Sequence, residues 1–196
     1  MRTKEEIRQE MRAKRKEISK EERRVAGKEI CKKLIESEIY LLLKSWKVAL
    51  YLSTTHEIPT RYIARSIWES KREVVVPYWS TTKESYQLTL MRPMAKLISG
   101  KMGIREPQER IPVTPEEVDA FILPGLAFDA QGGRLGYGAG IYDKILTQAR
   151  KSVPKIAICY DWQVLEEPLP LEAHDIRMDW LVTEKRVIHC KKNNLL

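Results

Sequence analysis

Short apolar runs rich in β-branched and aromatic residues alternate along this chain with stretches of helical periodicity, and this alternation constrains the fold more than any other feature. The pattern predicts strands at 46–52, 73–77, 119–123, 155–159 and 180–182. Between the first two strands, Ile63, Ile67 and Trp68 recur at helical spacing, so we expect a strand–helix–strand unit with parallel pairing. We therefore predict the α/β class: a single three-layer α/β/α domain over residues 1–196 with a mostly parallel central sheet.

Two helices are predicted before the first strand. Ile7, Met11 and Ile18 share one face of a helix over residues 4–18. Ser19 and Glu22 form a capping box, so a second helix is expected from about residue 20 to the low forties. Further along, the patterns predict a half-exposed strand at 86–91, an irregular proline-bearing loop at 105–114, a helix at 142–150 and a loose tail at 191–196.

Composition excludes several classes of protein. With 43% hydrophobic and 32% charged residues, the chain is ordinary for a folded globular protein. It holds no apolar run near the roughly 18 residues of a membrane span, and its first ten residues alternate in charge where a signal peptide needs an apolar stretch. Its three cysteines form no CxxC pair, so we expect a cytoplasmic protein without disulfides or membrane contact.

The net charge of +8 would attract polyanions, whether nucleic acid, anionic lipid or a small substrate rich in phosphate and carboxylate. Charge alone does not choose among these, and a generally basic proteome also explains the surplus. Four cations recur at spacings of four, four and three on the first predicted helix, where they form one basic stripe: Lys4, Arg8, Arg12 and Arg15. The stripe is suited to polyphosphate, or it is a solvated face relieved by Glu5, Glu6 and Glu10.

The glycine-rich segment at 123–146 follows a predicted strand and leads into a predicted helix. Five of the nine glycines fall within nine positions: Gly132, Gly133, Gly136, Gly138 and Gly140. Glycine lets backbone amides approach a ligand closely, and a helix N-terminus adds a positive dipole end, so the segment is suited to bind an anion. Its spacing matches neither the Walker pattern nor the dinucleotide fingerprint, and a tightly packed glycine-rich hairpin is the alternative.

Four side chains in this segment favour binding over packing. Arg134 offers a planar fork for phosphate or carboxylate, and Tyr137 and Tyr142 offer stacking faces. Asp143 lies where a hard metal ion that accompanies phosphates could be held.

The same segment resembles the signature of the 5-formyltetrahydrofolate cyclo-ligase family, which has a Pro-Gly-x-x-Phe-Asp stretch, then Gly-x-Arg-Leu-Gly, then a glycine and tyrosine run ending in Tyr-Tyr-Asp. Residues 124–129 and 133–143 match it closely. Two positions depart from the pattern, Ala139 and Ile141. Because Ile141 stands where the first tyrosine of the pair is usual, Tyr137 or Tyr142 would have to supply that role.

The resemblance implies an ATP- and magnesium-dependent ligase that closes 5-formyltetrahydrofolate to 5,10-methenyltetrahydrofolate through a phosphorylated imidate and releases ADP and phosphate. Lys4 and Arg8 match a Lys-x-x-x-Arg pair that contacts ATP phosphates in the family. The resemblance also implies ATP contacts along the glycine-rich segment, from Arg134, Gly136, Tyr137, Gly138, Ala139, Gly140, Ile141 and Tyr142. Arg134 and Tyr142 would be the catalytic residues.

Two further patches resemble the family. Residues 51–60 are similar to a strand and loop whose glutamate binds the folate, which implicates Glu57 together with Leu52 and Tyr142 in substrate binding. From the residues alone, Glu57 would be a charge at a helix N-terminus. Residues 172–175 resemble a late acidic position that would hold magnesium through Asp175 and Asp143, with Asp179 as the rival ligand of Asp175.

We expect a monomer that acts on a small folate, with or without a polyglutamate tail, and that has no nucleic-acid or membrane partner. Three alternatives stay open. The basic stripe would also suit a nucleic-acid-binding module, Ile141 would suit a family member that has lost turnover, and the fold would also suit a sugar-phosphate isomerase or a CoA-transferase.

Overall fold

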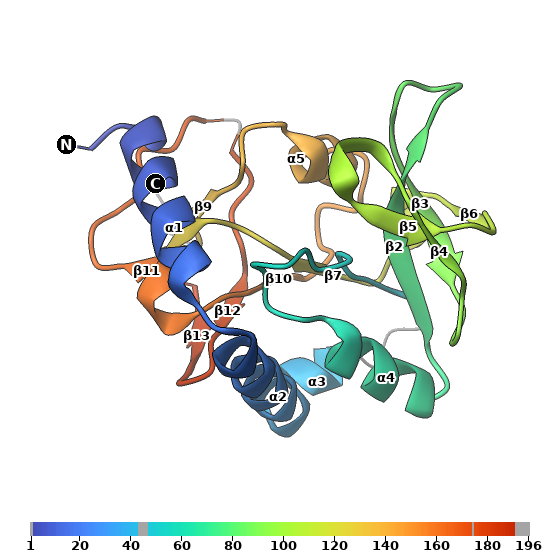
Figure 1. Cartoon of the computed structure of the whole chain (residues 1–196), viewed down its shortest axis with the longest axis horizontal. Helices are drawn as coiled ribbons and strands as arrows, with labels where there is room; N and C mark the ends of the chain where they lie inside the picture. Colours follow the sequence, from blue (N-terminus) through green and yellow to red (C-terminus); the bar gives the residue numbers. More distant parts are fainter. Residues whose placement is uncertain (1, 43–46, 174, 191–196) are drawn as a thin grey trace.

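The computed structural model describes residues 2–42, 47–173 and 175–190, and an eight-stranded mixed sheet lies at its centre (Figure 1). The strands follow the order β13-β12-β10-β7-β1-β2-β3-β6. Five neighbours pair in parallel: β12 (Trp180–Val182), β10 (Lys155–Ile158), β7 (Ala120–Leu123), β1 (Lys47–Ala49) and β2 (Glu73–Ser80). Three pair antiparallel at the edges: β13 (Val187–His189), β3 (Ser85–Met91) and β6 (Pro112–Val113).

Helices cover both faces of this sheet. On one face, α2 (Lys20–Glu36) and α4 (Arg61–Glu69) pack Ile30 and Ile63 against alternate strand residues such as Val48. On the other face, the short helix α5 (Ile141–Leu146) packs with the strand residues of opposite parity, such as Ala49. This alternation follows from the period of two in a strand. The prediction of an α/β fold with N-terminal helices and a mostly parallel sheet is confirmed.

The N-terminal helices begin at capping boxes. Helix α1 (Lys4–Glu17) starts after Thr3, and α2 starts after Ser19, whose side chain accepts from the Glu22 amide as predicted. The second helix ends at Glu36 instead of in the low forties. Ser37 is extended and its hydroxyl donates to the Leu34 carbonyl, so the chain leaves the helix there before α3 (Ile39–Leu42).

Two other predicted boundaries differ. The helix predicted at 142–150 is α5, which ends at Leu146. Beyond it, the Gln148 and Ala149 amides donate to carbonyls three residues back, so the chain continues as turns. The segment at 105–114, predicted as an irregular loop, contains the strands β5 (Arg105–Pro107) and β6. Prolines at the ends of these short edge strands hide their periodicity. Trp46 and the tail at 191–196 lie outside the described residues.

Two small sheets flank the central one. The hairpin of β4 (Leu97–Ser99) and β5 carries the 3-10 helix η1 (Lys101–Gly103) at its tip, and η2 (Pro115–Glu117) and η3 (Asp161–Gln163) are single turns. A second sheet joins β11 (Val164–Leu165), β8 (Ala127–Asp129) and β9 (Arg134–Leu135). In the ranges that the structure describes, no helix has the length and apolar character needed to cross a membrane.

Candidate active site

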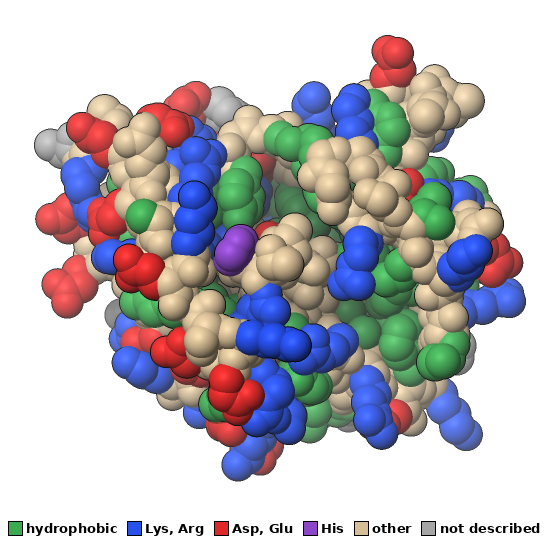
Figure 2. Space-filling model, in the orientation of Figure 1, with side chains coloured by type: hydrophobic (Ala, Val, Ile, Leu, Met, Phe, Trp, Pro, Cys, Tyr) green, Lys and Arg blue, Asp and Glu red, His purple; other side chains and the backbone are tan. Residues whose placement is uncertain are grey.

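A cavity of about 520 Å³ opens at the carboxyl ends of β1 and β7. Tyr51 and Leu52 follow β1 into its wall, and Pro124 and Gly125 follow β7. Figure 2 shows the hollow on this face, bordered on one side by Lys and Arg side chains along α1. This edge of a parallel sheet is where the fold class is expected to bind ligands.

Every residue to which the family resemblance gave a role lies in the wall of this cavity, with the exception of Asp179, the rival of Asp175. The shared wall brings together segments separated by more than a hundred residues in the sequence: Lys4, Arg8, Leu52, Glu57, Arg134, Gly136, Tyr137, Gly138, Ala139, Gly140, Ile141, Tyr142, Asp143 and Asp175. The structure therefore supports their grouping, whereas their individual roles stay predictions.

The glycine-rich segment divides into two structures. Gly132 and Gly133 form the turn of the β8–β9 hairpin, where a side chain on Gly132 would collide with the Met178 carbonyl. Gly138 and Gly140 have φ of +103° and +63°, in the left-handed region that favours glycine, and they line the cavity. The hairpin interpretation and the ligand-loop interpretation thus each account for part of the cluster. We call residues 136–140 the glycine loop.

The basic stripe of α1 docks on the glycine loop. Arg8 Nε donates to the Gly136 carbonyl at 3.1 Å, and Arg12 donates to the Tyr137 carbonyl at 3.2 Å. Lys4 pairs with Asp175 at 2.8 Å, and this hydrogen bond raises the pKa of Lys4, which stays charged at neutral pH. The stripe is therefore not the solvated face that local sequence alone favoured.

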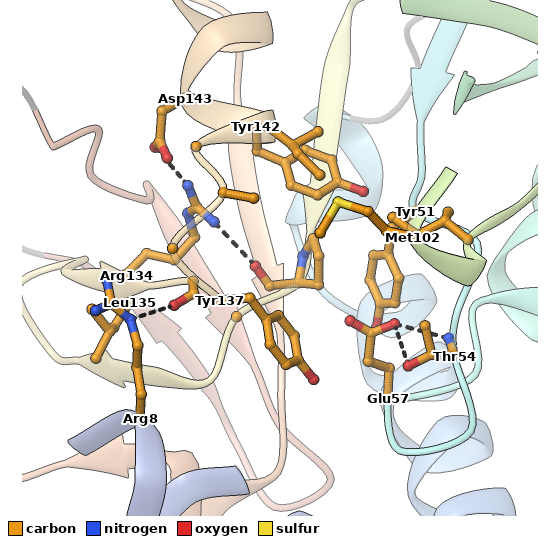
Figure 3. Close-up of a pocket in the computed structure, with 18 of the residues that line it drawn as sticks. Arg8, Tyr51, Thr54, Glu57, Met102, Arg134, Leu135, Tyr137, Tyr142 and Asp143 are labelled. Atoms are coloured by element: carbon orange, nitrogen blue, oxygen red, sulfur yellow. Dashed lines mark hydrogen bonds and ion pairs between the residues drawn. The ribbon is translucent and has the colours of Figure 1, made fainter. Parts of the chain in front are cut away.

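Arg134 is a buried cation held by one carboxylate. Its residue is 8% exposed, and its Nη2 donates to Asp143 at 2.6 Å while Nη1 donates to the Pro124 carbonyl at 3.4 Å (Figure 3). Its Nε has no partner among the described residues. An unpaired buried donor is rare in folded proteins, so this guanidinium is suited to a ligand acceptor that enters the cavity.

Glu57 lies on the opposite wall, and it is 6% exposed. One carboxylate oxygen accepts from the amide and the hydroxyl of Thr54, at 2.9 Å and 3.0 Å. The other oxygen accepts no bond from the described residues and is directed toward the cavity (Figure 3). The interpretation of Glu57 as a helix N-terminal charge is not supported, because it bonds within its own turn and not to α4.

Tyr142 closes the cavity between these walls. Burial, and then the charge of Glu57, raise its pKa far above the usual value, and Arg134 opposes this only in part. Its phenol therefore stays protonated at neutral pH and can donate a hydrogen bond.

Several lining residues were missed by the sequence analysis: Tyr51, Thr54, Met102, Ile104, Pro124, Gly125 and Leu135. Pro124, Gly125 and Leu135 belong to the motif that resembles the family, so the motif could have indicated them. Met102 and Ile104 come from the tip and end of η1, where no local pattern marks a site. Only the pairing of β4 with β5 brings them to the cavity.

The two candidate late aspartates lie in different places. Asp175 is in the cavity wall. Asp179 accepts from the Lys155 amide at 2.9 Å at the start of β10, which is the opposite end of the parallel strands. Among the described residues, no group of three or more His, Cys, Asp or Glu side chains forms a metal site.

These observations define the class of protein. A cavity at the carboxyl edge of a parallel sheet, with cations on one wall and an open carboxylate on the other, is typical of an α/β enzyme that binds a small anionic ligand.

Comparisons with known proteins identify the family. The model of the 5-formyltetrahydrofolate cyclo-ligase family matches residues 1–184. A probable 5-formyltetrahydrofolate cyclo-ligase of Schizosaccharomyces pombe is 31% identical over 179 residues, covering 81% of this chain and 84% of that protein. The NMR structure of 5,10-methenyltetrahydrofolate synthetase from Aquifex aeolicus is 35% identical, with a TM-score of 0.82 over 98% of this chain and 95% of that one. The chain belongs to the 5-formyltetrahydrofolate cyclo-ligase family.

The compartment varies among relatives. A 5-formyltetrahydrofolate cyclo-ligase of Arabidopsis thaliana, 27% identical over 81% of this chain and 66% of that protein, is named as mitochondrial. Membership of the family therefore does not decide the compartment, and a cytoplasmic location stays a prediction.

Proposed function

We propose that this enzyme uses ATP to cyclise 5-formyltetrahydrofolate to 5,10-methenyltetrahydrofolate. The family is ATP-dependent and implies a folate substrate. The observation that carries the proposal is the division of the cavity: Lys4, Arg8 and Arg134 lie on the wall with the glycine loop, and Glu57 lies on the other. This arrangement suits a triphosphate on one side and the N–H groups of a pterin on the other.

The proposed reaction needs no nucleophile from the protein. The formyl oxygen attacks the γ-phosphorus and ADP leaves, which gives an imidate phosphate on nitrogen 5. Nitrogen 10 then attacks the formyl carbon and loses its proton. The bond from that carbon to the phosphorylated oxygen breaks, and the oxygen leaves as part of inorganic phosphate. Catalysis on this route is alignment of two substrates and stabilisation of charge on the transferred group.

The cations on the glycine-loop wall would bind the phosphates. Arg134 lines the cavity with its guanidinium, and Arg8 and Lys4 add charges from α1. Each of these cations already has an oxygen partner, which holds its side chain in place before ligand arrives. We propose Arg134 and Tyr142 as the catalytic residues, because a buried guanidinium and a half-buried phenol each place a hydrogen-bond donor in the cavity wall.

The Glu57 wall would bind the folate. The oxygen of Glu57 that accepts no bond can accept from the amino group and a ring N–H of the pterin, which are adjacent donors. Leu52 adds apolar contact beside it, and Tyr142 lies within reach of both walls.

The residues present fit a magnesium ion. Asp143 and Asp175 are both in the cavity wall, and magnesium is usually bound by one or two carboxylates together with phosphate oxygens and water. When bound, the ion would neutralise phosphate charge. We propose these two aspartates as its ligands, and Asp143→Asn should raise the magnesium concentration needed for half-maximal rate. Asp179→Asn, outside the cavity, is the matched control, and equal magnesium curves for both variants would remove Asp143 from the site.

The test of the function is direct. Purified protein is incubated with 5-formyltetrahydrofolate, ATP and magnesium, and the absorbance of the methenyl product is followed. We expect product with all three and none without ATP. Binding of both substrates without product would identify a member that has lost turnover, and absence of any product or binding would refute the proposal.

We also propose that the chain acts as one domain and as a monomer, on folates with or without a polyglutamate tail, and without a nucleic-acid partner. Sedimentation at working concentration tests the oligomeric state. Comparison of KM for mono- and pentaglutamate substrates tests the tail, and a steeply salt-dependent RNA affinity would contradict the last point.

A further inference from the structure

Arg15 is the fourth cation of the basic stripe, and it is only 3% exposed. Its guanidinium donates to oxygens from three separate segments. Nε donates to the His56 carbonyl at 2.9 Å, and Nη1 donates to the Gly125 carbonyl at 3.3 Å and to the Tyr137 hydroxyl at 3.0 Å. This one side chain therefore connects α1 with the Glu57 loop, the loop after β7 and the glycine loop.

Arg15 differs from the rest of the stripe in its lack of a carboxylate partner. Lys4 pairs with Asp175, and Arg8 and Arg12 both pair with Glu5. Arg15 forms no salt bridge with any carboxylate in the part of the chain that the structure describes. A buried charge without a counter-charge opposes folding. A neutral side chain would fill the same space without the free-energy cost of removing a charge from water.

The bond from Arg15 determines what the Tyr137 hydroxyl can do. Arginine only donates, so the phenolic oxygen accepts and its own hydrogen stays available. Partial burial raises the pKa of Tyr137, with Arg15 opposing, and the phenol is protonated at neutral pH. No acceptor among the described residues takes that hydrogen, and Tyr137 lines the cavity. The hydroxyl is a donor held in position for a ligand.

Arg15 supplies most of the contacts that orient the Tyr137 side chain. The residue is 47% exposed, and its ring contacts the guanidinium groups of Arg12 and Arg15, each 5.8 Å from the ring centre. Arg12 bonds the backbone carbonyl and leaves the hydroxyl untouched. The bond from Arg15 is thus the only hydrogen bond that the Tyr137 hydroxyl forms among the described residues.

The hydroxyl lies at the border of the two walls. Arg15 also binds the carbonyl of His56, the residue before Glu57, so Tyr137 and Glu57 are held through one guanidinium. The charge of Glu57 acts on Tyr137, and Figure 3 shows the two side chains on neighbouring parts of the wall. In a pterin, the amino group and ring N–H that Glu57 would bind are followed along the same edge by a ring carbonyl, which needs a donor.

We propose that Arg15 is a positioning residue for the folate: it holds the Tyr137 hydroxyl where that hydroxyl donates a hydrogen bond to the pterin carbonyl beside Glu57. The proposal rests on the proposed function and adds a folate contact to Tyr137, whose backbone stays part of the glycine loop.

The test compares Tyr137→Phe, Arg15→Met and the double variant. We measure the Kd for 5-formyltetrahydrofolate by calorimetry without ATP, the KM for each substrate, and Tm. Tyr137→Phe should raise the folate Kd and KM about tenfold, as for the loss of one hydrogen bond, with the ATP KM changed by less than about twofold. Arg15→Met should act in the same direction, and the double variant should be no weaker than Arg15→Met, because both remove one interaction.

Arg12→Met is the matched control, since Arg12 contacts the same ring and leaves the hydroxyl bond intact. Its folate Kd should change by less than about threefold, compared with the rise of about tenfold expected for Tyr137→Phe. An unchanged folate Kd in Tyr137→Phe, additive losses in the double variant, or a change confined to the ATP KM would each overturn the proposal.

Tyr137→Phe leaves Arg15 in place, so the test holds even where Arg15→Met fails to fold. A wild-type protein that binds the folate without forming product would refute the proposed function and leave the Kd comparison readable. A wild-type protein that does not bind the folate would refute both.

Discussion

The cavity wall formed by α1 and the glycine loop draws its side chains from distant parts of the sequence, whereas the Glu57 wall is one continuous segment. On the first wall, Lys4 meets Asp175 and Arg8 meets Gly136. On the second, residues 51–60 bond among themselves: Glu57 to Thr54, Tyr51 to Ile58, and Thr60 to Tyr51.

This difference shows how the charged side chains of each wall are held in position. A dense set of cations repels itself, so each cation is held by its own oxygen partner, and for Lys4 and Arg8 that partner comes from a distant segment. A single carboxylate needs only a local turn to orient it. We therefore expect changes at Lys4, Arg8 and Arg134 on the first wall to act on ATP, and changes on the second wall to act on the folate alone. The Tyr137 hydroxyl, at the border of the two walls, is the exception proposed above.

The largest effect is expected from Arg134→Met. This variant removes the buried donor of the first wall and leaves Asp143 without its partner. By analogy with the loss of one preorganised donor to a developing charge, kcat/KM should fall by about a hundredfold or more. Steady-state kinetics measure this, and Tm confirms that the variant is folded. A loss below about fivefold would exclude a catalytic role for Arg134, since a preorganised donor contributes far more.

Glu57→Gln should come next. The amide keeps the shape of the side chain and loses the charge that accepts from two donors, so the folate KM should rise about tenfold to a hundredfold. The ATP KM should stay the same. An equal rise in both KM values would mean that the two walls do not divide the substrates as we propose.

Lys4→Met should raise the ATP KM by about fivefold to tenfold, which corresponds to one charge-assisted contact near the surface. Lys14→Met is the matched control on the same helix, because Lys14 pairs with Glu10 and is absent from the cavity wall. If both lysine variants raise the ATP KM equally, the effect of Lys4 comes from the overall charge of the helix and not from a direct contact with ATP.

The smallest effect is expected from Thr54→Val, which removes the hydroxyl that orients Glu57 and leaves the backbone bond. The folate KM should rise about threefold, for part of one hydrogen bond. Thr54→Ser restores the hydroxyl and should restore the KM. A Thr54→Val variant with wild-type folate KM would show that the backbone amide alone positions the carboxylate.

Local patterns accounted for much of the fold, and the resemblance to the family supplied the candidate site residues. The apolar, β-branched run at 73–77 and the capping box at Ser19 are local signals, and the structure agrees with both. They failed where a side chain competed with the helix, as at Ser37, and where prolines interrupted short edge strands, as at Pro107. In these places the energy differences are small and tertiary contacts decide.

By itself, the sequence determined that this is an α/β protein. It also identified a glycine-rich segment, a basic helix and Glu57 as parts of the candidate site. Both results follow because periodicity, caps and motifs depend on neighbours in the chain. Only the tertiary structure decided where each of them lies. It showed that two glycines form a hairpin, that Arg15 is buried behind Tyr137, and that Asp175 and not Asp179 reaches the cavity. A cation on a helix has the same local pattern whether it faces water or a carbonyl, and packing alone distinguishes the two.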